Sequence, residues 1–152
     1  MPNSNSASVT LDKYNVSKDK LLSGAFEDLR KELRAHENNT GEPRMPVFSI
    51  ASGLIGHVHE NKRLFHAVVG KRSSLVVQHR FRQLVIDLVE EDLAASDIPA
   101  TRHAPVTHYI ANALFGLLTW WVDSRSPLAP DELEMLFREL TMSVFSMLRH
   151  KK

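Results

Sequence analysis

The sequence predicts an all-α protein, a bundle of about six helices. Apolar residues recur at three- and four-residue steps along most of the chain, which is the spacing of one face of an α-helix. Strand signals are missing, because the chain has no extended alternation of apolar and polar residues and no Asn-Gly or Asp-Gly turn. Short breaks rich in proline, glycine and asparagine separate the helical stretches, which is typical of a helix bundle.

Three helices are expected in the first half of the chain. Ser17 is a candidate N-cap for a helix that runs to about Asn38. The sequence Asn38-Asn-Thr-Gly-Glu-Pro43 is expected to end this helix. A second helix is expected from about Pro46 to Glu60. A short third helix from Lys62 to Val69 precedes a glycine that can close it.

Two glycines lie inside the second predicted helix. Gly53 and Gly56 each lower its intrinsic stability by up to about 1 kcal/mol relative to alanine. Such a cost is expected where another helix or a ligand approaches the backbone closely. Of these two interpretations we favour close helix packing.

A long fourth helix is expected next. Ser73 or Ser74 can cap it, and its apolar stripe continues to about Ala95. Pro99 and Pro105 then bracket a predicted loop. Since proline is favoured in the first helical turn, Pro105 is expected at the start of the following helix.

The last third of the chain holds the most apolar helix, over residues 104–122, and a final helix that begins at Pro130. Asp131 and Glu132 suit the positive end of that final helix. The helix over 104–122 is apolar over most of its circumference, and a chain of this length cannot cover it on every side. A second copy of the chain can supply the missing cover, so the pattern predicts a homodimer.

Composition excludes several classes of protein. The 152 residues fit one domain, which we place at residues 17–150 after a flexible polar tail at 1–16. Nineteen basic and 18 acidic residues nearly cancel, so no overall field favours nucleic acid or an anionic membrane. The chain lacks cysteine, a signal peptide and an apolar run long enough to span a bilayer. We therefore expect a cytoplasmic protein without disulfides.

No motif in the chain predicts catalysis, a metal or a cofactor. The phosphate loop, the Gly-x-Ser-x-Gly elbow and His-Glu-x-x-His are all absent, so we expect no enzyme. His57 and His59 are two residues apart and point away from each other on a helix, which disfavours a shared metal ion. The acidic run 90–92 and the basic residues at positions 71, 72, 80 and 82 are expected to be solvated surface.

Three segments, taken in order, resemble the C-terminal domain of TetR-type transcriptional regulators. The strongest is Phe115-Gly-Leu-Leu-Thr-Trp-Trp-Val-Asp-Ser-Arg-Ser-Pro-Leu-Ala-Pro-Asp-Glu-Leu133. The second is Ile55-Gly-His-Val-His-Glu-Asn-Lys-Arg-Leu-Phe65. The third, Ser17-Lys-Asp-Lys-Leu-Leu22, is similar to the opening of the helix that joins the DNA-binding and sensing halves in that family.

The resemblance implies a homodimer in which the last two helices of each copy form a four-helix bundle. It also implies that a small-molecule effector can bind between the early helices. No helix-turn-helix precedes Ser17, so we expect no direct DNA binding by this chain and no membrane contact. We expect either a piece of a longer regulator or a stand-alone sensing domain.

Two sets of residues are the candidates for these roles. The expected dimer interface comprises apolar positions of the last two helices: Leu114, Gly116, Leu117, Trp121, Leu133, Phe137, Leu140 and Val144. The expected lining of an effector pocket is an apolar set with a few polar tips: Phe26, Leu54, His57, Phe65, Phe81 and Tyr109. Ordinary core packing is the alternative for both sets.

Two other functions fit the same sequence. The chain can be an interaction module without a ligand, which pairs with a full-length regulator and deprives that dimer of one DNA-binding half. It can also be a small-molecule-binding helical protein outside transcription.

Overall fold

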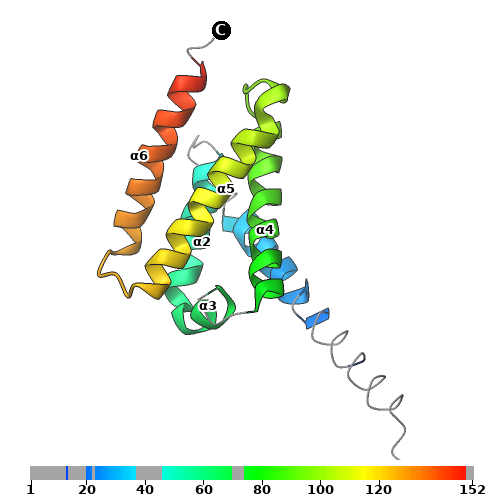
Figure 1. The fold of residues 1–152 in the computed structure, drawn as a ribbon, viewed down its shortest axis with the longest axis vertical. Coiled ribbons are helices and arrows are strands. Elements are labelled where there is room, and N and C mark those ends of the chain that lie inside the picture. Colours follow the sequence, from blue (N-terminus) through cyan, green and yellow to red (C-terminus); the bar gives the residue numbers. More distant parts are fainter. Residues whose placement is uncertain (1–12, 14–19, 22, 37–45, 70–73, 150–152) are drawn as a thin grey trace, which may run out of the picture.

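The computed structural model describes residues 13, 20–21, 23–36, 46–69 and 74–149. Nearly all of them are helical, no strand occurs among them, and Figure 1 shows an all-α bundle. The prediction of an all-α bundle is therefore confirmed. Most of the tail predicted at 1–16, the cap at Ser17 and the break that follows Asn38 lie outside the described residues.

Six helical segments make up the described bundle. The first spans residues 23–36 and is called the N-terminal segment below. The others are α2 (Pro46–Glu60), α3 (Lys62–Val69), α4 (Leu75–Ala94), α5 (Ala100–Asp123) and α6 (Pro130–Arg149). The bounds predicted for α2 and α3 and the start predicted for α6 are confirmed. Ser74 caps α4, because its hydroxyl accepts the Val77 N–H at 3.2 Å.

The predicted start of α5 is wrong. Pro99 is the N-cap, the helix begins at Ala100, and Pro105 lies inside it. A proline inside a helix removes one backbone hydrogen bond and usually costs about 3 kcal/mol. Here Val106 and Ile110 are buried just beyond it, so the packing of this face keeps the helix continuous through the proline.

Helices α4 and α5 lie side by side along the bundle and form the larger part of the core (Figure 1). Phe81, Leu88, Ile110 and Leu114 are almost completely buried between them and their neighbours. Helix α2 packs in turn against α4 and, on another side, against α6. The bundle therefore has α2 near its centre and α6 at one edge.

Helix α6 is attached to α2 through aromatic side chains. The Phe48 ring meets Phe137 and Phe145 edge to face, with ring centroids 6.4 and 6.5 Å apart. Edge-to-face contacts of this kind add about 0.5–1.5 kcal/mol per pair to the stabilisation from burial. This contact fixes the inner face of α6 and leaves its opposite face uncovered.

The N-terminal segment is held to the end of α4 by charged groups 57 to 61 residues away in the sequence. Arg34 Nη1 lies 2.9 Å from Asp92 Oδ1, and Arg30 and Arg34 both pair with Glu91. Asp92 is buried. The prediction of a solvated acidic face at 90–92 is therefore wrong for Asp92, whereas Glu90 and Glu91 remain exposed.

Among the described residues, no helix combines the length and the apolar character that a bilayer span requires.

Candidate functional site

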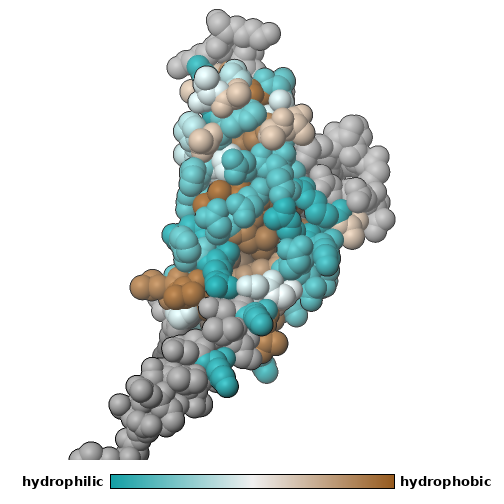
Figure 2. Space-filling view, turned by 90° about the vertical axis from the view of Figure 1, so that its right-hand side faces the viewer, coloured by the Kyte–Doolittle hydropathy of each residue, from teal (hydrophilic) through white to brown (hydrophobic). Residues whose placement is uncertain are grey.

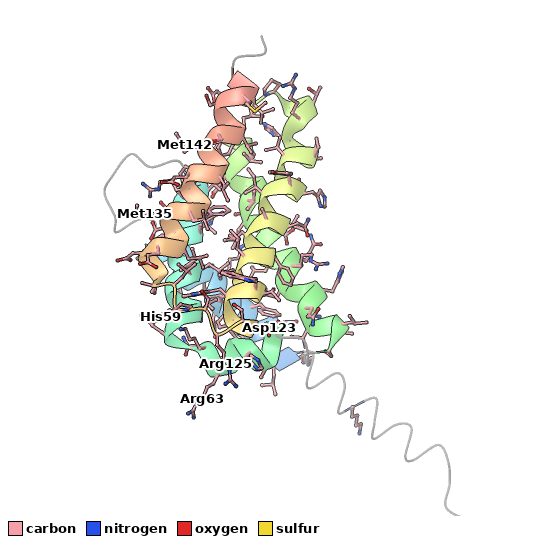
Figure 3. The ribbon with its side chains drawn as sticks, turned by 60° about the vertical axis from the view of Figure 1, so that its left-hand side comes forward. His59, Arg63, Asp123, Arg125, Met135 and Met142 are labelled. Atoms are coloured by element: carbon pink, nitrogen blue, oxygen red, sulfur yellow. The ribbon has the colours of Figure 1, made fainter. Side chains whose placement is uncertain are left out.

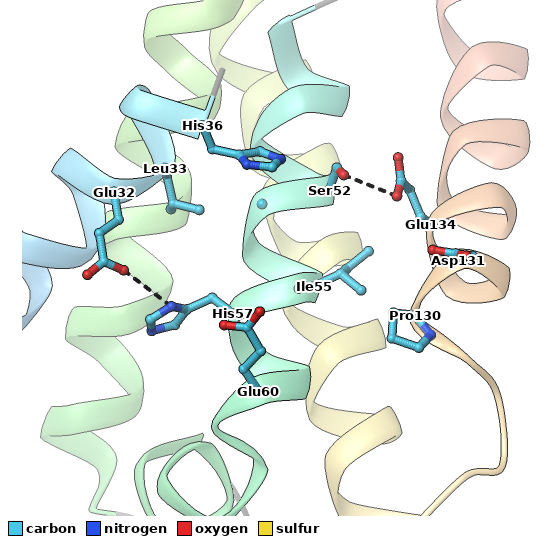
Figure 4. Close-up of a pocket in the computed structure, with 12 residues that line it drawn as sticks. Glu32, Leu33, His36, Ser52, Ile55, His57, Glu60, Pro130, Asp131 and Glu134 are labelled. Atoms are coloured by element: carbon cyan, nitrogen blue, oxygen red, sulfur yellow. Dashed lines mark hydrogen bonds and ion pairs between the residues drawn. The ribbon is translucent and has the colours of Figure 1, made fainter. Parts of the chain in front are cut away.

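A pocket of about 370 Å³ lies between the N-terminal segment, α2 and the start of α6 (Figure 4). Its wall on one side is the N-terminal segment, its floor is the middle of α2, and the first turn of α6 closes the other side. The lining residues are Glu32, Leu33, His36, Ser52, Gly53, Ile55, Gly56, His57, Glu60, Pro130, Asp131 and Glu134.

The two glycines of α2 have different roles in this pocket. A Cβ at Gly53 would lie 3.0 Å from Leu33 Cδ2, so this glycine lets the N-terminal segment approach the α2 backbone. The interpretation as close helix packing fits this position. At Gly56 a Cβ would meet nothing within 4 Å, so the missing side chain leaves open space in the pocket.

Polar contacts cross the pocket walls from both sides of α2. His57 Nδ1 lies 3.4 Å from Glu32 Oε2 of the N-terminal segment, and the Ser52 hydroxyl donates to Glu134 Oε2 of α6 at 3.1 Å (Figure 4). Residues three or four apart on a helix share a face, so the α2 residues at 52, 53, 56 and 60 can all contribute to one pocket. A few polar contacts across the pocket walls thus connect the three helical segments that line the pocket.

Carboxylates dominate the charge of the lining. Glu32, Glu60, Asp131 and Glu134 all contribute, and the described residues of the lining include no lysine or arginine. Glu134 also meets Arg138 at 3.5 Å, one helical turn further along α6. No group of three or more potential metal ligands close enough to hold an ion occurs among the residues that the structure describes.

The six residues predicted to line an effector pocket are placed differently. Five of them cluster around the core, where the Phe81 ring contacts Phe26 at 6.0 Å and Phe65 at 5.6 Å, and His57 meets Phe65 edge to face at 5.6 Å. Leu54 is fully buried beside them. This cluster fills its own space, and only His57 reaches the pocket of Figure 4.

Tyr109 does not belong to that cluster, because its side chain lies on the outer face of α5 with 62% of its surface exposed. Apolar residues line both protein cores and ligand pockets, so the apolar pattern of the sequence could not distinguish the two, and core residues were predicted as pocket residues. The pocket residues that sequence reasoning missed are mostly polar, such as Glu32, Ser52 and Asp131. Gly56, one turn from Gly53, was the available signal for an open space on α2.

The eight residues predicted for a dimer interface divide in the same way. Leu114, Trp121, Leu133 and Phe137 are buried within the protomer, which leaves them little surface to offer a partner copy. Leu117 and Val144 are partly buried. Gly116 and Leu140 are exposed, and Leu140 keeps 56% of its surface accessible. The periodicity identified the helices but not the face of each helix that turns outward.

Two exposed stripes with the same spacing run along α5 and α6. The stripe on α5 comprises residues 109, 113, 116 and 120, and the stripe on α6 comprises residues 136, 140, 143 and 147. Each contains large exposed apolar side chains, namely Tyr109 and Trp120 on α5 and Leu136, Leu140 and Met147 on α6. Met135 and Met142 are also exposed and point away from the bundle on the outer side of α6 (Figure 3).

A groove of about 540 Å³ adjoins the α5 stripe, between α4 and α5. Phe115, Gly116 and Trp120 line it, and Arg82 of α4 lies over the Phe115 ring at 4.5 Å. A Cβ at Gly116 would meet nothing within 4 Å, so the α5 backbone is accessible there. Figure 2, which faces the α4 side of the molecule, shows a mainly hydrophilic surface with hydrophobic residues near its middle and in a separate group at its lower left.

The consecutive tryptophans of the strongest sequence match have opposite orientations. Trp121 is buried, and its Nε1 donates to the Leu128 carbonyl at 3.0 Å, which ties the α5–α6 connection to the end of α5. His59 of α2 stacks on the same indole at 6.0 Å. Trp120 is turned outward. Trp121 therefore anchors the α5–α6 connection, and Trp120 contributes exposed apolar surface.

A family model described as "Transcriptional regulator C-terminal region", of the TetR type, matches residues 48–143. No curated protein and no solved structure shows significant similarity to the chain. The matched residues run from the first turn of α2 into α6 and so include most of the pocket, the whole α5 stripe and the α6 stripe except residue 147. Since the match spans more than half of the chain, the protein belongs to the family of TetR-type transcriptional regulator C-terminal regions.

Proposed function

We propose that this chain is the effector-sensing and homodimerisation domain of a TetR-type transcriptional regulator. The observation that carries the proposal is the combination of an open pocket against the N-terminal segment with two exposed apolar stripes on the last two helices. The pocket is suited to a ligand, and the apolar stripes are suited to contact with another copy of the chain. The family membership supports a regulatory role for both.

The pocket provides a route from ligand binding to movement. A ligand there contacts Glu32, Leu33 and His36 on one side and the body of the bundle on the other. The resemblance relates the N-terminal segment to the helix that joins the sensing and DNA-binding halves. A ligand that binds more tightly when the N-terminal segment takes one position relative to the bundle therefore increases the population of that position.

The dimer is proposed to form through the outer stripes of α5 and α6. Single exposed apolar residues are common on protein surfaces, but a repeated four-three-four spacing on two adjacent elements in the sequence is typical of helix pairing. A partner's helices against these stripes complete a four-helix bundle, and Gly116 lets one of them approach closely.

Sedimentation of paired variants tests the dimer. The double change Leu136→Glu and Leu140→Glu puts two carboxylates into the proposed interface and is expected to convert a dimer at micromolar concentration into a folded monomer. The control is Leu75→Glu with Val76→Glu, which alters two exposed apolar residues at the start of α4. Helicity measured by circular dichroism verifies that each variant is folded. A monomeric parent protein, or a folded α6 variant that remains dimeric, contradicts this interface.

A further inference from the structure

Among the residues that the structure describes, sulfur occurs only on the outer side of α6. The chain has no cysteine and five methionines, and the three described ones, Met135, Met142 and Met147, all lie on this helix. Each keeps at least 45% of its surface accessible. Because an oxidant must reach the sulfur atom to react with it, all three thioethers are open to oxidation in the isolated chain.

The three methionines belong to two different faces of α6. Met147 lies on the α6 stripe with Leu136 and Leu140, since steps of four and three residues return to the same side of a helix. Met135 and Met142 are two helical turns apart and share a neighbouring face that points away from the bundle (Figure 3). The proposed dimer interface therefore covers Met147 and leaves Met135 and Met142 at its edge.

We propose that Met147 is an oxidation site that controls self-association, an inference that rests on the proposed dimer. A hydroperoxide transfers one oxygen atom to the thioether of Met147. The sulfur loses two electrons and becomes a sulfoxide, while the O–O bond breaks and the oxidant is reduced to water or an alcohol. The reaction takes place in the monomer, where the side chain is exposed, and a second copy of the chain shields the same sulfur in the dimer.

The sulfoxide changes the chemistry of the α6 stripe at one position. Its oxygen is a strong hydrogen-bond acceptor, which keeps its water in the monomer and loses it inside an apolar interface. Leu136 and Leu140 have no donor to replace that water, and the Ser143 hydroxyl already donates to the Glu139 carbonyl at 3.1 Å. Oxidation therefore favours the monomer, and a two-fold symmetric dimer carries the cost twice.

The dependence of oxidation on protein concentration tests the assignment to Met147. The protein is treated with hydrogen peroxide below and above the dissociation constant of the dimer, and peptide mass spectrometry quantifies the sulfoxide at each methionine. We expect the rate at Met147 to fall at least about threefold in the dimer, because association hides its sulfur. The rates at Met135 and Met142 serve as internal controls and are expected to change less than about twofold, because these side chains stay outside the interface.

Sedimentation before and after peroxide treatment measures the effect on the dimer. We expect oxidation of the parent protein to raise the dissociation constant about tenfold or more, through the buried polar group. Methionine sulfoxide reductases should restore the original value. Circular dichroism verifies that the oxidised protein remains helical.

Matched variants identify the methionine that acts. Met147→Leu keeps an apolar side chain that cannot form a sulfoxide, so peroxide should raise its dissociation constant less than about twofold. Met135→Leu with Met142→Leu removes two exposed methionines beside the stripe and should respond to peroxide as the parent does. Met147→Gln places a polar group at the same position and should weaken the dimer about tenfold without any oxidant.

The outcomes separate this inference from the proposed function. An oxidised parent with an unchanged dissociation constant, a Met147→Leu variant that loses the dimer on oxidation, or a Met147 rate independent of protein concentration each overturns the oxidation site. All three results leave the proposed dimer in place. A parent protein that sediments as a monomer before treatment contradicts the dimer itself, and the inference fails with it.

Discussion

Helix α2 is covered on two sides by contacts of opposite chemistry. On the α6 side, Phe48 packs between Phe137 and Phe145 with rings edge to face. On the other side, the N-terminal segment approaches through Gly53 and is held by a histidine–carboxylate contact on α2 and by arginine–carboxylate pairs on α4. Aromatic contacts depend on close fit, whereas partly exposed charge pairs weaken with salt and adapt to a new neighbour.

The difference suggests which part of the bundle moves. The α6 side has the properties of a fixed support, since its contacts are buried and tightly packed. The N-terminal segment has the properties of an adjustable element, because partly exposed charge pairs supplement its buried Leu29 and Leu33 and the pocket lies directly beside it. Three experiments test this contrast, in order of decreasing expected effect on the free energy of unfolding.

The largest effect is expected at the aromatic support. Phe137→Ala removes a ring that is 1% exposed and is expected to lower the free energy of unfolding by about 3–5 kcal/mol, through lost burial and the cavity left behind. Urea denaturation measures the change. Leu75→Ala, at an exposed leucine, serves as the control and is expected to change stability by less than about 0.5 kcal/mol. Equal losses in the two variants would show that α6 is not anchored through Phe137.

A smaller effect is expected at the charged contact of the N-terminal segment. Asp92→Asn weakens the bond to Arg34, and hydrogen bonds to charged groups contribute about 1.5–3 kcal/mol. We expect a loss of about 1–3 kcal/mol together with faster amide exchange in residues 23–36, and little change in α6. Glu90→Gln, on the same turn but exposed, is the comparison variant. If amide exchange accelerates in α6 as much as in residues 23–36, the two sides of α2 do not differ in the way described.

The smallest effect is expected from the two glycines of α2, which form a matched pair. Gly56→Ala adds a methyl group to open space and is expected to raise stability by up to about 1 kcal/mol through helix propensity. Gly53→Ala has the same propensity gain, but its methyl group meets Leu33 at 3.0 Å. Thermal unfolding should therefore place Gly53→Ala below Gly56→Ala. The reverse order would mean that the N-terminal segment does not approach α2 at Gly53.

Much of the fold follows from local features of the sequence. Pro130 followed by two acidic residues defines the start of α6, and Ser74 defines the start of α4 through a side-chain cap. These signals act within one helical turn, so they can be interpreted without a structure. Pro105 was the exception, because buried residues beyond it keep α5 helical and a local rule does not include that packing.

The candidate site was much less predictable. The apolar residues expected around a ligand, such as Leu54 and Phe81, are core residues, while the pocket is lined by carboxylates and polar groups from three segments. Polar residues on a helix surface have no periodicity that distinguishes a pocket from open solvent. Gly56 carried some information, but glycine in a helix indicates both close packing and empty space.

The sequence by itself determined the helices, most of their ends and the family, because caps, prolines, apolar spacing and ordered motifs act over short stretches of chain. Only the tertiary structure decided which apolar residues face inward, as with Trp121 against Trp120, and which distant charges meet, as with Arg34 and Asp92. Those outcomes depend on how helices far apart in the sequence approach each other. The spacing within one helix does not contain that information.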